Sequence, residues 1–152
     1  MDARFNKDSV EMAKDWFKDH PQYAVIGGYM SPVADAYGKK GLLSGDHRRA
    51  MCHRAVLEHA EVMVDEWESL KSEYTTTVNV LKHFSAELNK NNTSALPSEC
   101  NDYRNQFPYI NSSSMTVKIA LLCGGDMLAS FNMPGVWADK DVSAEFDRVP
   151  AY

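Results

Sequence analysis

The sequence has few cysteines, no long apolar run and no concentration of basic charge. Its three cysteines, Cys52, Cys100 and Cys123, are an odd number without paired spacing, so they indicate neither a disulfide framework nor a zinc site. No stretch is apolar enough to span a bilayer, and the N-terminus carries no apolar signal core. We therefore expect an intracellular protein, in the cytoplasm or the nucleus, without a membrane partner.

The charge balance is acidic, with 16 lysines and arginines against 21 aspartates and glutamates and a net charge of −5. Because phosphate contacts dominate nucleic-acid binding, a chain with this balance and no basic cluster is poorly suited to that partner. The 152 residues are 44% hydrophobic, which is enough for one domain with a core.

The most informative stretch is residues 23–48. A short apolar run, 23–26, ends in two glycines and opens into a loop, after which Ser44 is placed to cap a helix. The loop carries a carboxylate, an aromatic ring and two lysines, namely Asp35, Tyr37, Lys39 and Lys40. Loops that leave the carboxyl ends of parallel strands form ligand sites, so this loop is a candidate anion site. Its composition also fits a solvated turn.

Further strands and helices follow the same alternation. We expect a helix from Ser9 to His20, a helix over 44–59 with Ala50, Met51, Ala55 and Val56 on its apolar face, a strand over 61–65, a helix over 75–89, a strand over 115–123 and a helix from Asp139 to Phe146. Strands that alternate with helices predict an α/β fold with a parallel sheet. The segment 90–114 is rich in asparagine and serine and reads as a variable insertion without a nuclear import signal.

Histidines and arginines gather in the expected helix over 44–59: His47, Arg48, Arg49, His53, Arg54 and His59. Histidines six apart lie on different faces of a helix, which favours a solvated basic face over a metal site. We therefore predict no metal ligands in this chain.

Three stretches resemble, in the same order, the eukaryotic nicotinamide/nicotinate mononucleotide adenylyltransferases. They are 28–33 with 35–37, 39–43 and 47–48, then 64–77, and then 121–137. The resemblance covers roughly residues 11–142, apart from 91–114. It implies a Rossmann-like, doubly wound parallel sheet of the nucleotidylyltransferase type. It also implies synthesis of NAD, or deamido-NAD, and pyrophosphate from the mononucleotide and ATP with Mg²⁺, in a chain that could form a homo-oligomer.

The resemblance also implies site residues, and it gives His47 and Arg48 a role in supporting the loop rather than in the chemistry. It makes Lys39 the catalytic cation, with Lys40 as a fallback, and gives the mononucleotide contacts as Tyr37, Lys39, Trp67, Tyr74, Thr77, Gly124, Asp126, Val136 and Trp137. Tyr74 and Trp137 would stack on the nicotinamide ring, and Asp126 would accept hydrogen bonds from ribose hydroxyls. Two alternatives stay open, because Trp67 could pack in the core and Asp126 could cap a helix.

Two ATP-phosphate motifs of that family have no counterpart in the sequence. Nothing upstream of Ser9 resembles the loop Gly-x-Phe-x-Pro-x-x-x-x-His, and the sequence stops at Tyr152 before a Ser-Ser-Thr-x-x-Arg motif. We therefore expect a partial nucleotidylyltransferase domain over 1–152 that lacks the first strand and the C-terminal strands and is inactive or weakly active alone. The alternative is a non-catalytic form that binds the mononucleotide or a partner protein.

Overall fold

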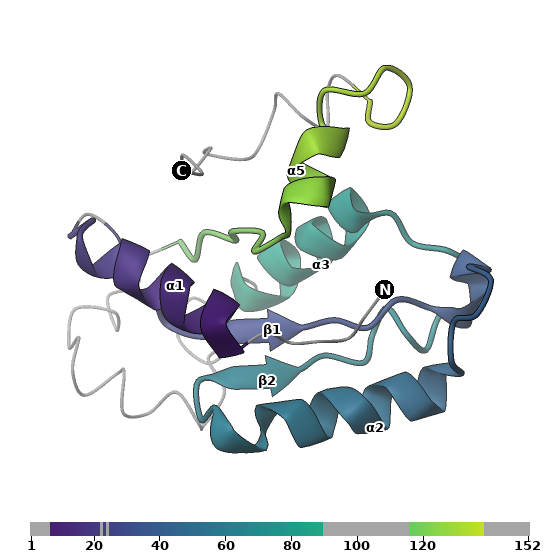
Figure 1. Cartoon of the computed structure of the whole chain (residues 1–152), viewed down its shortest axis with the longest axis horizontal. Helices are drawn as coiled ribbons and strands as arrows, with labels where there is room; N and C mark the ends of the chain where they lie inside the picture. Colours follow the sequence, from purple (N-terminus) through teal and green to yellow (C-terminus); the bar gives the residue numbers. More distant parts are fainter. Residues whose placement is uncertain (1–6, 22, 24, 90–115, 139–152) are drawn as a thin grey trace.

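The computed structural model describes residues 7–21, 23, 25–89 and 116–138, and of residues 7–10 it describes the backbone alone (Figure 1). Its helices and strands are α1 (Lys7–Lys18), β1 (Gly28–Met30), the 3₁₀ helix η1 (Asp35–Tyr37), α2 (Gly45–Ala55), the 3₁₀ helix η2 (Val56–Glu58), β2 (Val62–Val64), α3 (Thr77–Asn89) and α5 (Gly125–Ser130). The expected insertion over 91–114 and the expected helix 139–146 lie outside the described residues.

Within the described residues the sheet consists of two parallel strands, with Gly28 opposite Val62 and Met30 opposite Val64. In Figure 1 both arrows point to the same end of the molecule, and α2 lies along β2. The connection from β1 to β2 through α2 is a strand-helix-strand unit, which confirms the predicted α/β class.

The strand that precedes the lysine-containing loop does not lie where the apolar run predicted it. The apolar run 23–26 precedes the sheet, and β1 begins at Gly28. The position of β1 is set by β2, because the Gly28 amide donates to the Glu61 carbonyl at 2.8 Å and the Asp65 amide donates to the Met30 carbonyl at 3.0 Å. A strand exists only where backbone groups find a partner, and hydrophobicity alone does not locate that partner.

The strand predicted over 115–123 is wrong for its described part, 116–123, which is not in a strand. The backbone of Val117 is bonded instead to a side chain of α3. Its amide donates to Asn89 Oδ1 at 2.8 Å, and its carbonyl accepts from Asn89 Nδ2 at 3.1 Å. Leu122 is 56% exposed, so the apolar run is not the buried strand that a continuous run suggests.

Helix α2 begins as predicted, because Ser44 caps it by accepting a hydrogen bond from the His47 amide at 3.4 Å. The predicted apolar face is wrong. Met51 is exposed, as is Ala50, whereas Arg48 and Cys52 are buried. Helix α1 begins at Lys7, so Ser9 lies inside the helix and does not cap it.

The core draws most of its side chains from α3 and the others from β2, α2 and the segment after β1. Its buried apolar side chains are Ala34, Cys52, Val62, Val78, Val80, Leu81 and Phe84. Phe84 packs against Tyr29 of β1 with ring centroids 4.9 Å apart, which fixes α3 on the sheet. Helix α1 is tied to the start of β2 by the ion pair between Lys14 and Glu61. None of the helices in the described residues has the length and apolar character needed to cross a membrane.

Candidate functional site

Two loops leave the carboxyl ends of β1 and β2 at the same end of the sheet (Figure 1). We call residues 31–44 the first loop and residues 65–76 the second loop. The first loop contains η1 and leads into α2, and the second leads into α3. In an open parallel sheet this is the end at which ligands bind.

The structure brings together one predicted site residue from each loop. The rings of Tyr37 and Tyr74 have centroids 5.3 Å apart and an angle of 33° between their planes. They are 46% and 50% exposed, so each keeps ring surface open to solvent. Partial burial raises the pKa of Tyr74, and Tyr37 and Glu68 contribute to the rise. Electron-rich aromatic faces of this kind suit a flat cationic ring.

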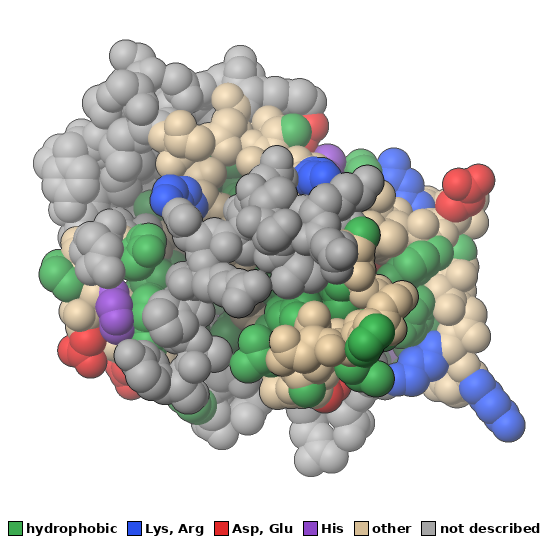
Figure 2. Space-filling view, turned by 90° about the horizontal axis from the view of Figure 1, so that it is seen from above, with side chains coloured by type: hydrophobic (Ala, Val, Ile, Leu, Met, Phe, Trp, Pro, Cys, Tyr) green, Lys and Arg blue, Asp and Glu red, His purple; other side chains and the backbone are tan. Residues whose placement is uncertain are grey.

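The two lysines of the first loop are exposed and follow η1 directly. Gly38 and Gly41 bracket them with positive φ angles of 65° and 80°, a conformation that favours glycine and turns the chain sharply at both sides. Within the described part of the chain, neither Lys39 nor Lys40 forms an ion pair with a carboxylate. Figure 2 shows basic side chains projecting at the end of the molecule where Figure 1 places η1. These ammonium groups are therefore accessible to an anion.

Trp67 packs against α3. Its ring stacks on His83 with centroids 3.9 Å apart and planes 6° apart, and the Lys71 ammonium lies 4.2 Å from the ring centroid. The Trp67 amide donates to Asp65 Oδ1 at 3.0 Å. This arrangement agrees with the alternative in which Trp67 is a packing residue. Thr77 is the first residue of α3 and is half-buried.

The remaining predicted site residues lie at α5 and the turn after it. Gly124 is the N-cap of α5, and the exposed Asp126 lies in the first turn of this helix. Val136 is 54% exposed. Trp137 packs edge-on against Phe131 and donates from Nε1 to Ser130 Oγ at 3.0 Å. The hydrogen bonds and ring contacts that the structure gives this group stay within 124–137, so it does not join the tyrosine pair.

Arg48 organises the first loop, as the resemblance implied for residues 47–48, but the prediction that it belongs to a solvated basic face is wrong. It is buried, and its guanidinium donates to the Leu43 carbonyl at 2.8 Å, to the Val33 carbonyl, and to Asp35 Oδ1 at 2.7 Å. The Arg48 guanidinium also holds the pKa of Asp35 below its usual range. A planar fork of donors satisfies several acceptors at once, so one side chain fixes both ends of the loop.

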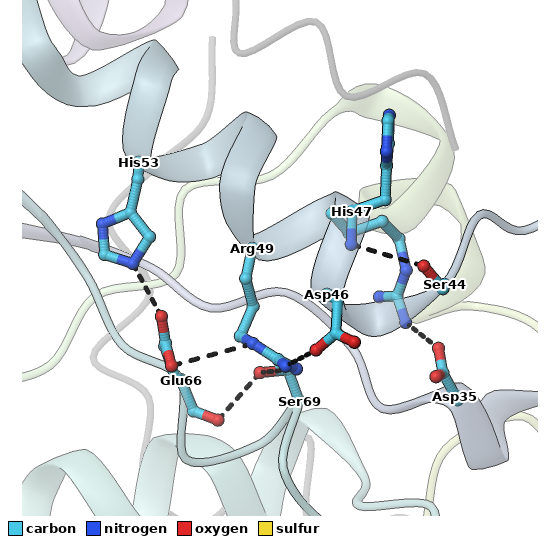
Figure 3. A network of polar contacts seen from close by, with 9 residues as sticks. Asp35, Ser44, Asp46, His47, Arg49, His53, Glu66 and Ser69 are labelled. Atoms are coloured by element: carbon cyan, nitrogen blue, oxygen red, sulfur yellow. Dashed lines mark hydrogen bonds and ion pairs between the residues drawn. The ribbon is translucent and has the colours of Figure 1, made fainter.

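Arg49 and His53 hold the second loop to α2 (Figure 3). Arg49 pairs with Asp46 of its own helix, lies 3.7 Å from Glu66 Oε2, and donates to Ser69 Oγ at 3.5 Å. His53 Nε2 lies 2.7 Å from Glu66 Oε1. Consecutive arginines of one helix therefore fasten two different loops. The pattern of two arginines after a helix cap was visible in the sequence, but their acceptors were not.

One cluster outside the loops has the composition of a metal site. Ligand atoms of Glu11, His59 and Glu61 lie within 4.8 Å of one another. The Lys14 ammonium pairs with both carboxylates of this cluster. Burial by itself would raise the pKa of Glu61, but the bond to Lys14 and the charges of Lys14 and His59 lower it overall. A cation of the chain itself therefore already neutralises these carboxylates.

No protein-family model matches the chain. It is 41% identical over 133 residues to nicotinamide/nicotinic acid mononucleotide adenylyltransferase 2 of Saccharomyces cerevisiae, a match that covers 87% of this chain and 31% of the yeast protein. The Arabidopsis thaliana enzyme of that name is 41% identical over 132 residues, covering 87% of this chain and 48% of the plant protein. The Bos taurus adenylyltransferase 1 is 36% identical over 149 residues, covering 88% and 53%.

The parallel β1–β2 pair and these matches are consistent with a Rossmann-like α/β fold of the nucleotidylyltransferase type. The chain is a homologue of the nicotinamide/nicotinic acid mononucleotide adenylyltransferases of yeast, plants and animals, as its three motif stretches predicted. It spans about a third of the length of the yeast relative and about half of the plant and bovine ones.

Proposed function

We propose that this chain forms the mononucleotide-binding part of an enzyme that joins nicotinamide or nicotinate mononucleotide to the adenylyl group of ATP. The products are NAD or deamido-NAD and pyrophosphate. The observation that carries the proposal is the identity of 41% over 87% of the chain to proteins named for this reaction. The exposed Tyr37–Tyr74 pair beside two accessible lysines is the local geometry that supports it.

The proposed chemistry needs no covalent nucleophile. The 5′-phosphate of the mononucleotide attacks the α-phosphorus of ATP in line, the bond to the β-phosphate oxygen breaks, and pyrophosphate leaves with that electron pair. Positioning and charge neutralisation supply the catalysis. In our proposal the tyrosine pair receives the cationic pyridine ring, and Lys39, with Lys40 beside it, neutralises the phosphate.

The other contacts stay as the resemblance implies them. Trp67 and Thr77 would lie on the side of the second loop, and Gly124, Asp126, Val136 and Trp137 would close the pocket from the segment that contains α5. For this arrangement, α5 and the turn after it must approach the tyrosine pair when ligand binds. A conformational closure of this kind is common in enzymes that exclude water from a phosphoryl-transfer site.

Mg²⁺ is the metal that such a reaction uses, and ATP phosphates supply its usual ligands. Most carboxylates of the two loops are already engaged, Asp35 by Arg48, Asp65 by the Trp67 amide, Glu66 by Arg49 and His53, and Glu68 by Ser31. Glu73 is exposed beside Tyr74, and one carboxylate does not form a cage. The described residues near the tyrosine pair therefore fit a Mg²⁺ ion that is bound through the phosphates rather than in a cage of protein carboxylates. Bound in this way, the ion would neutralise the charge that develops on pyrophosphate.

The test is NAD formation by the purified chain with nicotinamide mononucleotide, ATP and Mg²⁺, followed by chromatography. Calorimetric titration of the mononucleotide and of ATP, separately, accompanies it. Turnover that falls with Tyr74→Ala supports the full proposal. Mononucleotide binding without ATP binding or turnover supports the non-catalytic form of the same site. Absence of mononucleotide binding by folded protein would refute the proposal for this chain.

A further inference from the structure

One hydrogen bond joins the first loop to the second loop directly. The Ser31 hydroxyl donates to Glu68 Oε2 at 3.0 Å, across 37 positions of sequence. Ser31 follows β1 immediately, and Glu68 lies a few residues beyond β2. Of the side-chain hydrogen bonds that the structure describes, this is the one that connects these two loops.

Glu68 is unusually placed for a carboxylate. It is only 8% exposed, although glutamate is rarely buried unless it is paired. Burial raises the pKa of its carboxyl, while the Ser31 hydroxyl and the charge of Arg48 oppose the rise. A buried carboxylate costs free energy unless hydrogen bonds compensate for lost water. The bond from Ser31 is therefore important to both partners.

The tyrosine pair lies on the same two loops. Tyr37 lies as many residues beyond Ser31 as Tyr74 lies beyond Glu68. The Ser31–Glu68 bond and the Tyr37–Tyr74 ring contact are thus successive connections between the loops, the first near the sheet and the second near solvent. Arg48 holds the first loop and Arg49 the second loop to α2, but each arginine bonds to one loop alone.

We propose that Ser31 and Glu68 are positioning residues for the mononucleotide site. Their bond sets the separation of the two loops and thereby holds Tyr37 against Tyr74 in the geometry that receives a flat cationic ring. This inference rests on the proposed function and extends it, because neither side chain contacts the ligand in our proposal. Loss of the bond lets the loops separate and so weakens binding of the mononucleotide.

The experiment compares Ser31→Ala, Glu68→Ala and the double variant, with Ser31→Thr as the variant that keeps the hydroxyl. Ser72→Ala and Glu73→Ala are matched controls, since both residues are exposed on the second loop. Affinity for nicotinamide mononucleotide is measured by calorimetry. The ring environment is followed by fluorine NMR of protein labelled with 3-fluorotyrosine, and the Tyr37 and Tyr74 signals are assigned by Phe substitution.

We expect each single alanine variant to bind the mononucleotide about three- to tenfold more weakly, since a cation–π contact at an exposed site corresponds to roughly a two- to fivefold change per ring. The double variant should be no weaker than the singles, because both remove the same bond. Both tyrosine signals should move in the alanine variants and return in Ser31→Thr. The controls should stay within twofold of the parent.

A lower melting temperature with unchanged affinity and unchanged fluorine signals would show that the bond is structural only and would overturn the proposal. Additive losses in the double variant would also overturn it. If the parent chain binds no mononucleotide, the proposed function fails for this chain. The fluorine signals alone then show whether the Ser31–Glu68 bond positions the two tyrosines. Circular dichroism of each variant confirms that the comparison is made on folded protein.

Discussion

Replacing Arg48 with alanine tests how the first loop is held. The guanidinium makes charged hydrogen bonds to two backbone carbonyls, those of Leu43 and Val33, and one to Asp35. A hydrogen bond to a charged group contributes about 1.5–3 kcal/mol, and removing the arginine returns part of the cost of burying its charge. The Asp35 side chain is 65% exposed and is hydrated again after the change, so its bond adds little. We expect a loss of about 3–4 kcal/mol.

Urea unfolding followed by far-ultraviolet circular dichroism measures this loss. A decrease of that size should lower the melting temperature by about 10 °C in a domain of this length. Arg48→Lys should lose about half as much, because an ammonium on a flexible stem cannot satisfy both carbonyls in the geometry of the fork. Arg54→Ala is the control, since Arg54 is exposed on the same helix, and it should change the free energy of unfolding by under about 0.5 kcal/mol.

The bonds from Arg48 to the two carbonyls account for most of the expected loss of stability. Asp35→Asn should therefore be nearly neutral. If Asp35→Asn costs as much as Arg48→Ala, the ion pair is what matters and the assignment is refuted. A loss below about 1 kcal/mol in Arg48→Ala would show that water replaces the guanidinium without penalty, and the contribution expected from the two carbonyl bonds would then be wrong.

Three further predictions concern single side chains. Because burial raises the folded-state pKa of Glu68 above its ordinary 4.5, the stability it contributes is full below pH 4.5 and is lost as pH rises through the folded value. The free energy of unfolding of the parent relative to Glu68→Gln should fall as the pH rises above 4.5, by about 1.4 kcal/mol per unit of pKa difference, and a flat difference would contradict the assignment. Phe84→Ala should cost about 3–5 kcal/mol in urea unfolding, because the ring is buried against Tyr29, and a loss under about 1 kcal/mol would show that α3 is not packed on β1 as described. If the chain shows turnover in the NAD-forming assay, Lys39→Ala should lower kcat about a hundredfold or more. A change confined to KM would mean that Lys39 stabilises the bound substrate and the transition state equally.

The sequence was sufficient to predict the elements that local interactions determine. The Ser44 cap, the strand over 62–64 and the helix from Thr77 all follow from short-range features, a capping hydroxyl, a short apolar run and a 3.6-residue period. The parallel pairing of β1 with β2 followed from the alternation of elements. The cap, the strand and the helix could be predicted because the residues that determine each of them are close in sequence.

The failures have a common physical origin in partners whose positions depend on the three-dimensional path of the chain. Whether Val117 belongs to a strand depends on what its backbone bonds to, and it bonds to the side chain of Asn89, 28 positions away. Arg48 looked like a surface residue because arginine usually is one, and the carbonyls that allow its burial belong to a loop whose path the sequence did not define. The contact of Tyr37 with Tyr74 was likewise invisible, although resemblance had named both residues.

Helix α2 explains how the loops that carry predicted binding residues are held in place. Four of the residues named by the motifs, Tyr37, Lys39, Trp67 and Tyr74, lie on the two loops. Successive positions of α2 point to different loops, since neighbours in a helix are rotated by about 100° from each other. Arg48 is thereby directed to the first loop and Arg49 to the second. Because α2 holds both loops, their relative position depends on this one helix. The Ser31–Glu68 bond then restricts only the movement between the loops that their two attachments to α2 still allow. Weakening either attachment should therefore make the site more sensitive to loss of that bond, so Arg49→Ala combined with Ser31→Ala should lose more mononucleotide affinity than the two single changes predict.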